Sequence, residues 1–208
     1  MTAMGAMMWI AASPVIAMYA VFINEVLLGL FPLRGDAVLP GKNIRTIVMI
    51  PAHNEASGIA GTLERLRSVL PSAADILVVA DNCSDETAET ARASGFEVVE
   101  RSDPARRGKG FALDYGRAHL ANSPPDCVMI LDADCIPDAG TIERLAAAAL
   151  RHGRPVQAVN LMRAGPDAGP IVQISNFAFM IKNLVRQRGL VRAGDADGDR
   201  HGLSLADL

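Results

Sequence analysis

Between residues 46 and 190 the sequence alternates short apolar runs with longer segments whose apolar residues recur at helical spacing. The apolar runs predict buried strands at residues 47–50, 76–80, 96–100 and 127–131, with a fifth at 156–161. The periodic segments predict helices at residues 57–70, 85–93, 109–120, 138–151 and 170–188. This alternation is typical of a mainly parallel sheet with flanking helices. The chain is therefore predicted to be an α/β protein.

An uncharged apolar run precedes this region, at residues 3–23. It is long enough to cross a bilayer core as a helix. The first positive charges follow at Arg34, Lys42 and Arg45, which predicts a single-pass anchor in the cell inner membrane with the body of the protein in the cytoplasm. A signal peptide and a buried helix are the alternatives. No basic residue precedes the run, and residues 24–26 form a poor cleavage site. Both features disfavour a signal peptide.

These patterns divide the chain into four predicted parts. Residues 1–33 form a membrane anchor, and residues 34–45 form a linker that contains two glycines and a proline. Residues 46–190 form the α/β domain. Residues 191–208 lose the apolar periodicity and become rich in Gly and Asp, so we expect an atypical polar tail there.

The composition argues against a nucleic-acid-binding protein. The chain has 20 Lys and Arg residues against 23 Asp and Glu residues, a formal net charge of −3, so it lacks a basic footprint. Aromatic residues make up only 4% of the chain, too few for stacking on single-stranded bases. The three cysteines are sparse and odd in number, which predicts no disulfide framework and a reduced setting.

Polar residues follow each of the first four predicted strands. In a parallel sheet these residues come to one edge, where such sheets bind ligands. An ordinary turn with helix caps would explain any single loop, but four loops at one edge favour a shared site. The four segments are Pro51-Ala52-His53-Asn54-Glu55, Asp81-Asn82-Cys83-Ser84-Asp85, Arg101 with Arg106-Arg107-Gly108-Lys109-Gly110, and Asp132-Ala133-Asp134.

The residue types in these loops suit a diphosphate. Asp132 and Asp134 directly follow a buried strand and can bind Mg²⁺ or Mn²⁺ through carboxylate oxygens. Lys109 lies between two glycines at a helix start and supplies a positive charge near free backbone amides. Asp81 and Glu55 can accept hydrogen bonds from a base or ribose. The sequence therefore predicts a site for a nucleoside diphosphate that carries another group.

Other chemistries lack their motifs in this sequence. There is no GxxxxGK[ST] segment, no GxGxxG after the first strand, no GxSxG elbow and no Cys–His spacing for structural zinc. A nucleotidyltransferase with a similar sheet would have a Gly-rich loop after the first strand, where this chain has Pro-Ala-His-Asn-Glu.

Four motifs occur in order, Ile-Pro-Ala-His-Asn-Glu at 50–55, Val-Val-Ala-Asp-Asn-Cys-Ser-Asp-Glu-Thr at 78–87, Gly-Lys-Gly-Phe-Ala-Leu at 108–113 and Leu-Asp-Ala-Asp at 131–134. This set resembles the family 2 glycosyltransferases with the GT-A fold, over roughly residues 46–190. The resemblance implies an enzyme that transfers a sugar from a nucleotide-diphosphate donor to a hydroxyl acceptor in glycan or polysaccharide synthesis. It further implies an inverting reaction assisted by Mg²⁺ or Mn²⁺.

The resemblance also implies roles for individual residues of the substrate site. Pro51, Ala52 and Glu55 would line the nucleoside pocket. Asp81 would bind the base, commonly uracil, which favours a UDP-sugar donor. Lys109 would lie near the base or the phosphates.

The segment Asp132-Ala133-Asp134 matches the DxD signature of the family. The resemblance implies that Asp134 is the main metal ligand and that Asp132 contacts ribose, metal-bound water or the metal itself. Ala133 would lie in the donor site between them. The expected partners are the nucleotide sugar, membrane lipid and a glycan or lipid-linked acceptor, and no nucleic acid.

An inverting transfer needs a general base to deprotonate the acceptor hydroxyl. The family supplies an acidic residue from the half that follows the DxD segment, often in a Glu-Asp pair. No such pair follows Asp134, Glu143 is expected on the surface, and the tail offers only Asp195, Asp197 and Asp199. We therefore expect the general base and the acceptor lobe to lie outside these residues, as in a truncated or frameshifted product. A non-catalytic nucleotide-binding remnant or accessory subunit is the alternative function, and a disordered polar tail is the alternative for the last residues.

Overall fold

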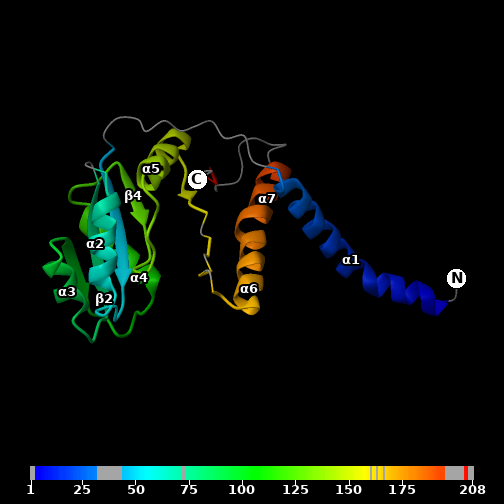
Figure 1. The fold of residues 1–208 in the computed structure, drawn as a ribbon, viewed down its shortest axis with the longest axis horizontal. Coiled ribbons are helices and arrows are strands. Elements are labelled where there is room, and N and C mark those ends of the chain that lie inside the picture. The colour runs from blue at the N-terminus through cyan, green and yellow to red at the C-terminus, as the bar shows by residue number, and fades with distance from the viewer. Residues whose placement is uncertain are drawn as a thin grey trace. The chain divides into compact units, whose positions relative to one another are not determined.

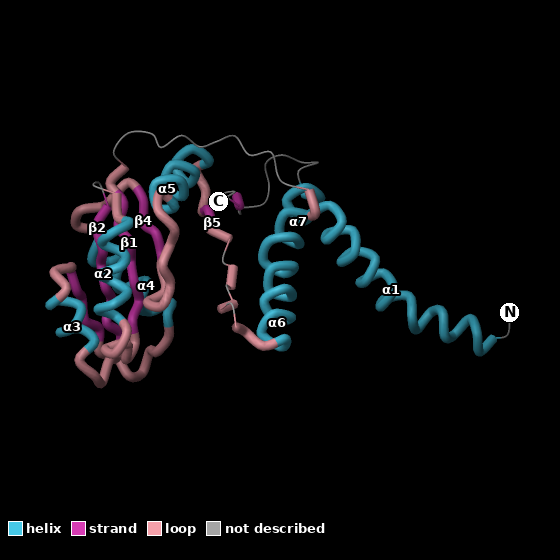
Figure 2. The backbone as a smooth tube through the Cα atoms, in the orientation of Figure 1, coloured by secondary structure: helices cyan, strands magenta, loops and turns pink. Residues whose placement is uncertain are grey.

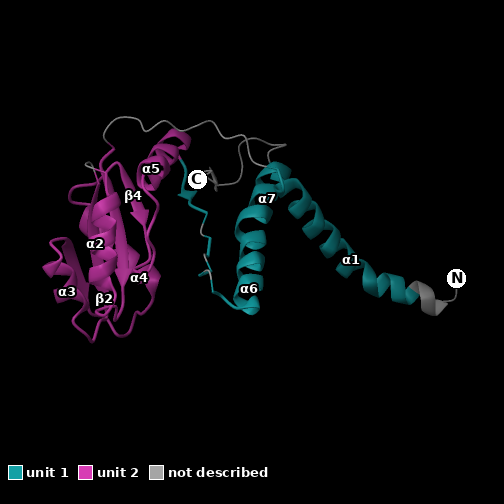
Figure 3. Ribbon diagram, in the orientation of Figure 1, with its two compact units in different colours: residues 1–37, 154–208 teal, residues 38–153 magenta. Residues whose placement is uncertain are grey.

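The computed structural model describes residues 3–31, 44–71, 74–159, 161–162, 164–165, 167–194 and 204–205. The chain divides into two compact units (Figure 3). One comprises residues 38–153, and the other comprises residues 1–37 and 154–208. The α/β domain predicted at 46–190 therefore includes residues of both units. Most of the predicted linker lies outside the described residues, as does most of the predicted tail.

The unit of residues 38–153 contains a four-stranded parallel sheet in the order β3-β2-β1-β4 (Figure 1). The predicted parallel α/β architecture is confirmed. The central strands are apolar and buried, as the sequence pattern indicates. The strands are β1 (Thr46–Ala52), β2 (Ala74–Asp81), β3 (Glu97–Arg101) and β4 (Cys127–Ile130).

Helices cover both faces of this sheet (Figure 2), because successive side chains of each strand point to opposite faces. Val48 and Ile50 of β1 pack in a core with α2, α3 and α5, whereas Ile47 and Met49 pack with α4. Leu63 of α2 is fully buried in the first of these cores. The helices are α2 (Ile59–Val69), α3 (Thr87–Ala93), α4 (Lys109–Leu120) and α5 (Thr141–His152).

The strand order creates a topological switch point between β1 and β4. The chain passes from β1 through β2 to β3 on one side, and β4 then pairs with the other edge of β1. Open α/β sheets bind ligands at the carboxyl ends of the strands beside such a point. The loops after β1 and β4, with Glu55 and Asp132, are therefore placed where this topology favours a ligand.

Two local predictions were wrong. The fifth strand is only β5 (Val156–Gln157), which pairs with β6 (Ser204–Leu205) in a separate two-stranded parallel sheet. The second wrong prediction is the start of the helix expected at residue 85. The Ser84 backbone N–H donates to Asn54 Oδ1 at 2.8 Å. The carboxylate of Asp85 accepts the Thr87 N–H at 3.1 Å, and α3 begins at Thr87 rather than at residue 85.

The described part of the unit of residues 1–37 and 154–208 is mainly helical, apart from the β5–β6 pair. Its first helix, α1 (Ala3–Gly29), continues through Asn24 and Glu25 without a break. The amphipathic helix predicted from Pro170 is present as α6 (Pro170–Met180), a π-helical segment η1 (Ile181–Val185) and α7 (Arg186–Gly194). It extends beyond the predicted end at residue 188.

Two glycines allow α1 and α7 to cross in close contact. A Cβ on Gly29 would lie 1.7 Å from the Val185 carbonyl oxygen, and one on Gly189 would lie 1.7 Å from the Glu25 carbonyl oxygen. The buried Glu25 carboxylate accepts a hydrogen bond from Arg186 Nε at 2.5 Å. The crossing therefore combines backbone proximity with an ion pair.

The stretch Met7–Gly29 of α1 has a mean hydropathy of 1.7 and is long and apolar enough to cross a membrane. Most of its large apolar side chains, including Trp9, Val15 and Phe22, are exposed. A signal sequence near an N-terminus passes the same test of length and composition.

Candidate functional site

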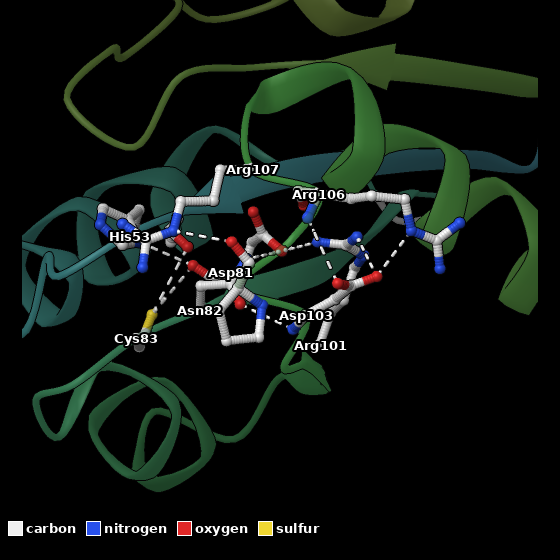
Figure 4. Close-up of polar contacts among 10 residues, drawn as sticks. His53, Asp81, Asn82, Cys83, Arg101, Asp103, Arg106 and Arg107 are labelled. Atoms are coloured by element: carbon white, nitrogen blue, oxygen red, sulfur yellow. Dashed lines mark hydrogen bonds and ion pairs between the residues drawn. The ribbon is translucent and has the colours of Figure 1, made fainter.

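The loops after β1 and β2 are joined by side-chain to backbone hydrogen bonds (Figure 4). His53 Nδ1 lies 2.7 Å from the Asp81 carbonyl oxygen, so Nδ1 carries the hydrogen and donates it. Asn54 and Asn82 adopt left-handed backbone angles, with φ of 56° and 51°. Asparagine tolerates this conformation better than most residues, which favours these two tight turns. His53 is therefore a loop residue that is hydrogen-bonded to the end of β2.

The β1 loop is also bound to the start of α3. The Glu55 N–H donates to the Thr87 hydroxyl oxygen at 2.8 Å, and the Ala56 N–H donates to Asp85 Oδ2 at 3.1 Å. The Thr87 hydroxyl in turn donates to Asp85 Oδ1 at 2.5 Å. The pKa of Asp85 is lowered, first by the Thr87 hydroxyl and then by the backbone N–H groups, because these donors stabilise the ionised carboxylate.

Pro51 and Ala52 lie at the carboxyl end of β1, opposite Val79 and Ala80 of β2. Ala52 is buried, with 3% of its surface exposed, and Pro51 is half-buried. Both residues therefore help to form the floor of the sheet edge beneath the Glu55 loop.

Asp81, the last residue of β2, forms a nearly buried ion pair with Arg101, the last residue of β3. Arg101 Nη1 donates to Asp81 Oδ1 at 2.6 Å, and the two side chains are 8% and 9% exposed, respectively. Arg101 also contacts the Arg106 carbonyl oxygen at 2.9 Å and Asp103 Oδ2 at 3.2 Å (Figure 4). The hydrogen bond from Arg106 holds the pKa of Asp103 below its ordinary value.

Lys109 and Asp132 are brought together from separate elements. Gly108 has a φ of 119°, a conformation that L side chains rarely adopt, and it directly precedes α4. Lys109 is the first residue of α4, and its ammonium group forms an ion pair with Asp132 Oδ1. Both side chains are about half exposed, so they remain accessible to a ligand.

The segment Asp132-Ala133-Asp134 alternates between core and solvent. Leu131 and Ala133 pack against the core, whereas Asp132 and Asp134 are exposed. The Cys135 thiol donates to Asp134 Oδ1 at 3.5 Å. Burial raises the pKa of Cys135, and the hydrogen bond to Asp134 raises it further.

The acidic residues fit a hard cation that shares its ligands with a substrate. Among the described residues there is no group of three or more His, Cys, Asp or Glu side chains that could hold a metal ion. Asp132 and Asp134 supply exposed carboxylate oxygens, and phosphate oxygens and water would supply the rest. Mg²⁺ commonly binds in this way, through one or two carboxylates and substrate phosphates.

The predicted site residues lie at the carboxyl ends of the strands, in the loops after them or at the start of α4; they are Pro51, Ala52, Glu55, Asp81, Lys109, Asp132, Ala133 and Asp134. The general-base candidates Asp195, Asp197 and Asp199 lie outside the described residues. The expectation that Glu143 lies on the surface was wrong. It is half-buried, and its Oε2 is buried with no hydrogen-bond partner in the described part of the chain.

The sequence places Arg101 among the residues after the strands but indicates no partner for it. The parallel register pairs its Cα with that of Asp81. The signal in the sequence was that both residues end their strands with opposite charges, but this becomes informative only when the register of β2 and β3 is known.

A parallel β3-β2-β1-β4 sheet with an Asp-Ala-Asp segment after its switch-point strand defines a glycosyltransferase fold of the GT-A type. The model of Glycosyl transferase family 2 matches residues 47–201, and the chain belongs to this family.

Several curated relatives match part of the chain. Glucosyl-3-phosphoglycerate synthase from Mycobacterium tuberculosis is 37% identical over 107 residues, which are 49% of this chain and 32% of that protein. Glycosyltransferase AglD from Haloferax volcanii is 32% identical over 120 residues, 54% of this chain and 19% of that protein. The matched segment thus spans about a third or less of each of these two relatives.

A solved structure shows the same fold. The mannosyltransferase PcManGT from Pyrobaculum calidifontis, in complex with GDP-Man and Mn²⁺, superposes with a TM-score of 0.53 at 21% identity. The superposition covers 67% of this chain and 41% of that one.

Proposed function

We propose that this chain binds a nucleotide-diphosphate sugar, with a UDP-sugar favoured, and serves a metal-assisted, inverting glycosyltransferase reaction. The acceptor is a hydroxyl group of a glycan or of another lipid-linked acceptor. The observation that supports this most is the contact between Lys109 and the first Asp of the Asp-Ala-Asp segment at the switch point of a family 2 fold.

Each residue has a distinct part in donor binding. Asp81 accepts a hydrogen bond from the base, and Pro51, Ala52 and Glu55 line the nucleoside pocket. Lys109 offsets negative charge on the diphosphate. Asp134 and Asp132 hold Mg²⁺ or Mn²⁺, with Ala133 between them against the core. The cation, when bound, neutralises charge that develops on the diphosphate leaving group.

The reaction exchanges one bond for another. The acceptor oxygen forms a bond to the anomeric carbon on the face opposite the donor's diphosphate, and the bond from that carbon to the diphosphate oxygen breaks. The hydroxyl proton passes to a general base, and the nucleoside diphosphate leaves. Lys109 is the first residue of α4. We place the leaving diphosphate beside this helix start, where the positive charge of Lys109 stabilises it.

We also propose that α1 anchors the protein in the inner membrane, with residues 46–190 in the cytoplasm. The length and hydropathy of Met7–Gly29 and the exposure of its apolar side chains support an anchor. Alkaline carbonate extraction of membranes tests this proposal. Protein that stays in the pellet at full length supports the anchor, whereas release of a chain shortened at the N-terminus indicates a cleaved signal.

Donor binding is tested by calorimetry on the full chain in detergent micelles with Mn²⁺. Tight binding of UDP and UDP-sugars supports the proposal, and failure to bind any nucleoside diphosphate contradicts it. An assay for transfer of a radiolabelled sugar to membrane glycans then distinguishes a glycosyltransferase from a non-catalytic nucleotide-binding protein. A chain that binds UDP-sugars but transfers nothing would be a non-catalytic nucleotide-binding protein.

A further inference from the structure

The guanidinium of Arg101 reaches three acceptors on different segments. It contacts Asp81 at the end of β2, Asp103 in its own loop and the carbonyl oxygen of Arg106 near the start of α4 (Figure 4). Its charged carbon also lies 5.5 Å from the centroid of the Phe111 ring in the first turn of α4. This nearly buried side chain therefore connects three segments at the carboxyl edge of the sheet.

The hydrogen bonds that Asp81 accepts from described side chains all end on the same oxygen. Arg101 Nη1 donates to Oδ1 at 2.6 Å, and Asn82 Nδ2 donates to Oδ1 at 3.1 Å. Asn82 is itself held by the Asp103 N–H, which donates to its Oδ1 at 2.7 Å. The arrangement fixes the carboxylate plane and leaves Oδ2 to accept a hydrogen bond from a ligand.

We propose that Arg101 is a positioning residue that sets the base selectivity of the donor site through Asp81. This proposal rests on the proposed function, in which Asp81 faces the base of the donor. With Oδ1 occupied, Asp81 presents a single negatively charged acceptor. Such a group suits a base with one N–H at its pairing edge, as uracil has at N3.

The same geometry disfavours the other pyrimidine. The N3 atom of cytosine carries no hydrogen and is itself an acceptor, so a fixed carboxylate oxygen would face a lone pair. Guanine offers two adjacent N–H groups and would use both oxygens of a free carboxylate, but Oδ1 is already occupied. Uridine nucleotides are therefore the class that this arrangement recognises.

Arg101 also links base recognition to the phosphate side of the site. Its bond to the Arg106 carbonyl and its contact with Phe111 brace the segment that leads to Gly108 and Lys109. Loss of Arg101 would therefore loosen both the plane of Asp81 and the path to Lys109.

The experiment compares UDP with CDP, because the two ligands share ribose and diphosphate and differ only in the base. Calorimetry on the full chain in micelles with Mn²⁺ gives both affinities for the wild type and for Arg101→Met. We expect wild type to prefer UDP, and Arg101→Met to lose at least about tenfold in UDP affinity, as one charge-assisted hydrogen bond implies. We expect CDP to lose less, because it would be affected only through the path to Lys109 and not through the base contact of Asp81.

Two further variants separate positioning from general damage. Arg92→Met removes an arginine from the exposed ion pair with Glu100 and should leave both affinities unchanged. Arg101→Lys keeps the charge but loses the planar fork, so it should still fold and still lose part of the UDP preference. Circular dichroism confirms folding of each variant, and Arg101→Lys carries the test if Arg101→Met does not fold.

The outcomes are distinct. A reduced UDP-to-CDP affinity ratio in the folded Arg101 variant supports the proposal. An unchanged ratio, whether both affinities fall together or neither falls, overturns the role of Arg101 while donor binding stands. A wild-type chain that binds neither nucleotide overturns the proposed function and this inference together.

Discussion

The ammonium group of Lys109 and the carboxylate of Asp132 form an ion pair between the first residue of α4 and the loop after β4. A cationic side chain therefore contacts the segment that is proposed to bind a divalent cation. The diphosphate of a donor would bring two further negative charges to this position, enough to hold the lysine and a cation together.

Asp134→Ala should abolish the Mn²⁺-dependent part of UDP binding, because Asp134 is an exposed carboxylate with no cationic partner among the described residues. Titration calorimetry with and without Mn²⁺ measures this part, and excess EDTA should reproduce the loss in the wild type. Asp114→Ala removes an exposed carboxylate that pairs with Arg117 on α4 and serves as the control. Unchanged metal dependence in Asp134→Ala would remove the metal assignment.

Lys109→Met should weaken UDP binding by about tenfold or more, since a charge-assisted contact to a phosphate is lost. Uridine has no phosphate, so its affinity should barely change. Calorimetry with the two ligands measures the difference. Equal losses for UDP and uridine would show that Lys109 acts on the base or on the fold rather than on the diphosphate.

Gly189→Ala should destabilise the crossing of α1 and α7, because its Cβ would lie 1.7 Å from the backbone oxygen of Glu25. Relief of such overlap requires the helices to separate, at a cost of about 1–3 kcal/mol or more. Thermal unfolding followed by circular dichroism in micelles gives the change. Gly61→Ala on α2 is the matched control, since nothing lies within 4 Å of its Cβ position, and it should be neutral or stabilising.

Leu63→Ala should lower the free energy of unfolding of the sheet-containing unit by about 2–5 kcal/mol. Leu63 of α2 is fully buried against the central strands. Leu150→Ala deletes the same atoms from a side chain that is 49% exposed on α5 and should cost far less. Urea unfolding monitored by far-UV circular dichroism compares the two variants.

Thr87→Val should raise the pKa of Asp85, because the Thr87 hydroxyl is the largest cause of its lowered value. A carboxylate whose pKa is depressed by folding stabilises the protein above its ordinary pKa. That contribution is lost as the pH falls through the folded-state value. As the pH falls, the variant should therefore lose the stabilising contribution of Asp85 at a higher pH than the wild type does. NMR titration of the Asp85 carboxyl carbon reports the shift, with Thr90→Val on the same helix as the control.

The local pattern of apolar residues was sufficient to predict the main architecture. The apolar runs of β1, β2 and β4 and the periodic segments of α2, α4 and α5 lie close to their predicted ranges. These elements are readable because burial of a strand or of one helix face imposes a period on the residues themselves. The motif residues at the strand ends follow from the same reading, since parallel strands bring their carboxyl ends to one edge.

Competition between neighbouring side chains for the start of a helix was harder to predict from the sequence. Ser84 and Asp85 are both good helix-capping residues, yet α3 begins only at Thr87. The Ser84 N–H binds Asn54 of another loop, and Asp85 accepts the Thr87 N–H. The segment after residue 156 is apolar enough for a strand, yet it pairs with Ser204–Leu205 rather than with the main sheet.

The sequence by itself determined the α/β class, the long apolar N-terminal helix and the set of charged residues at the strand ends. Only the tertiary structure decided which of those charges meet. The register of β2 and β3 places Arg101 beside Asp81, and the start of α4 places Lys109 beside Asp132. Each pair joins residues about 20 or more positions apart through a helical crossover. Periodicity reports which side of an element is buried, whereas such contacts depend on how separate elements align.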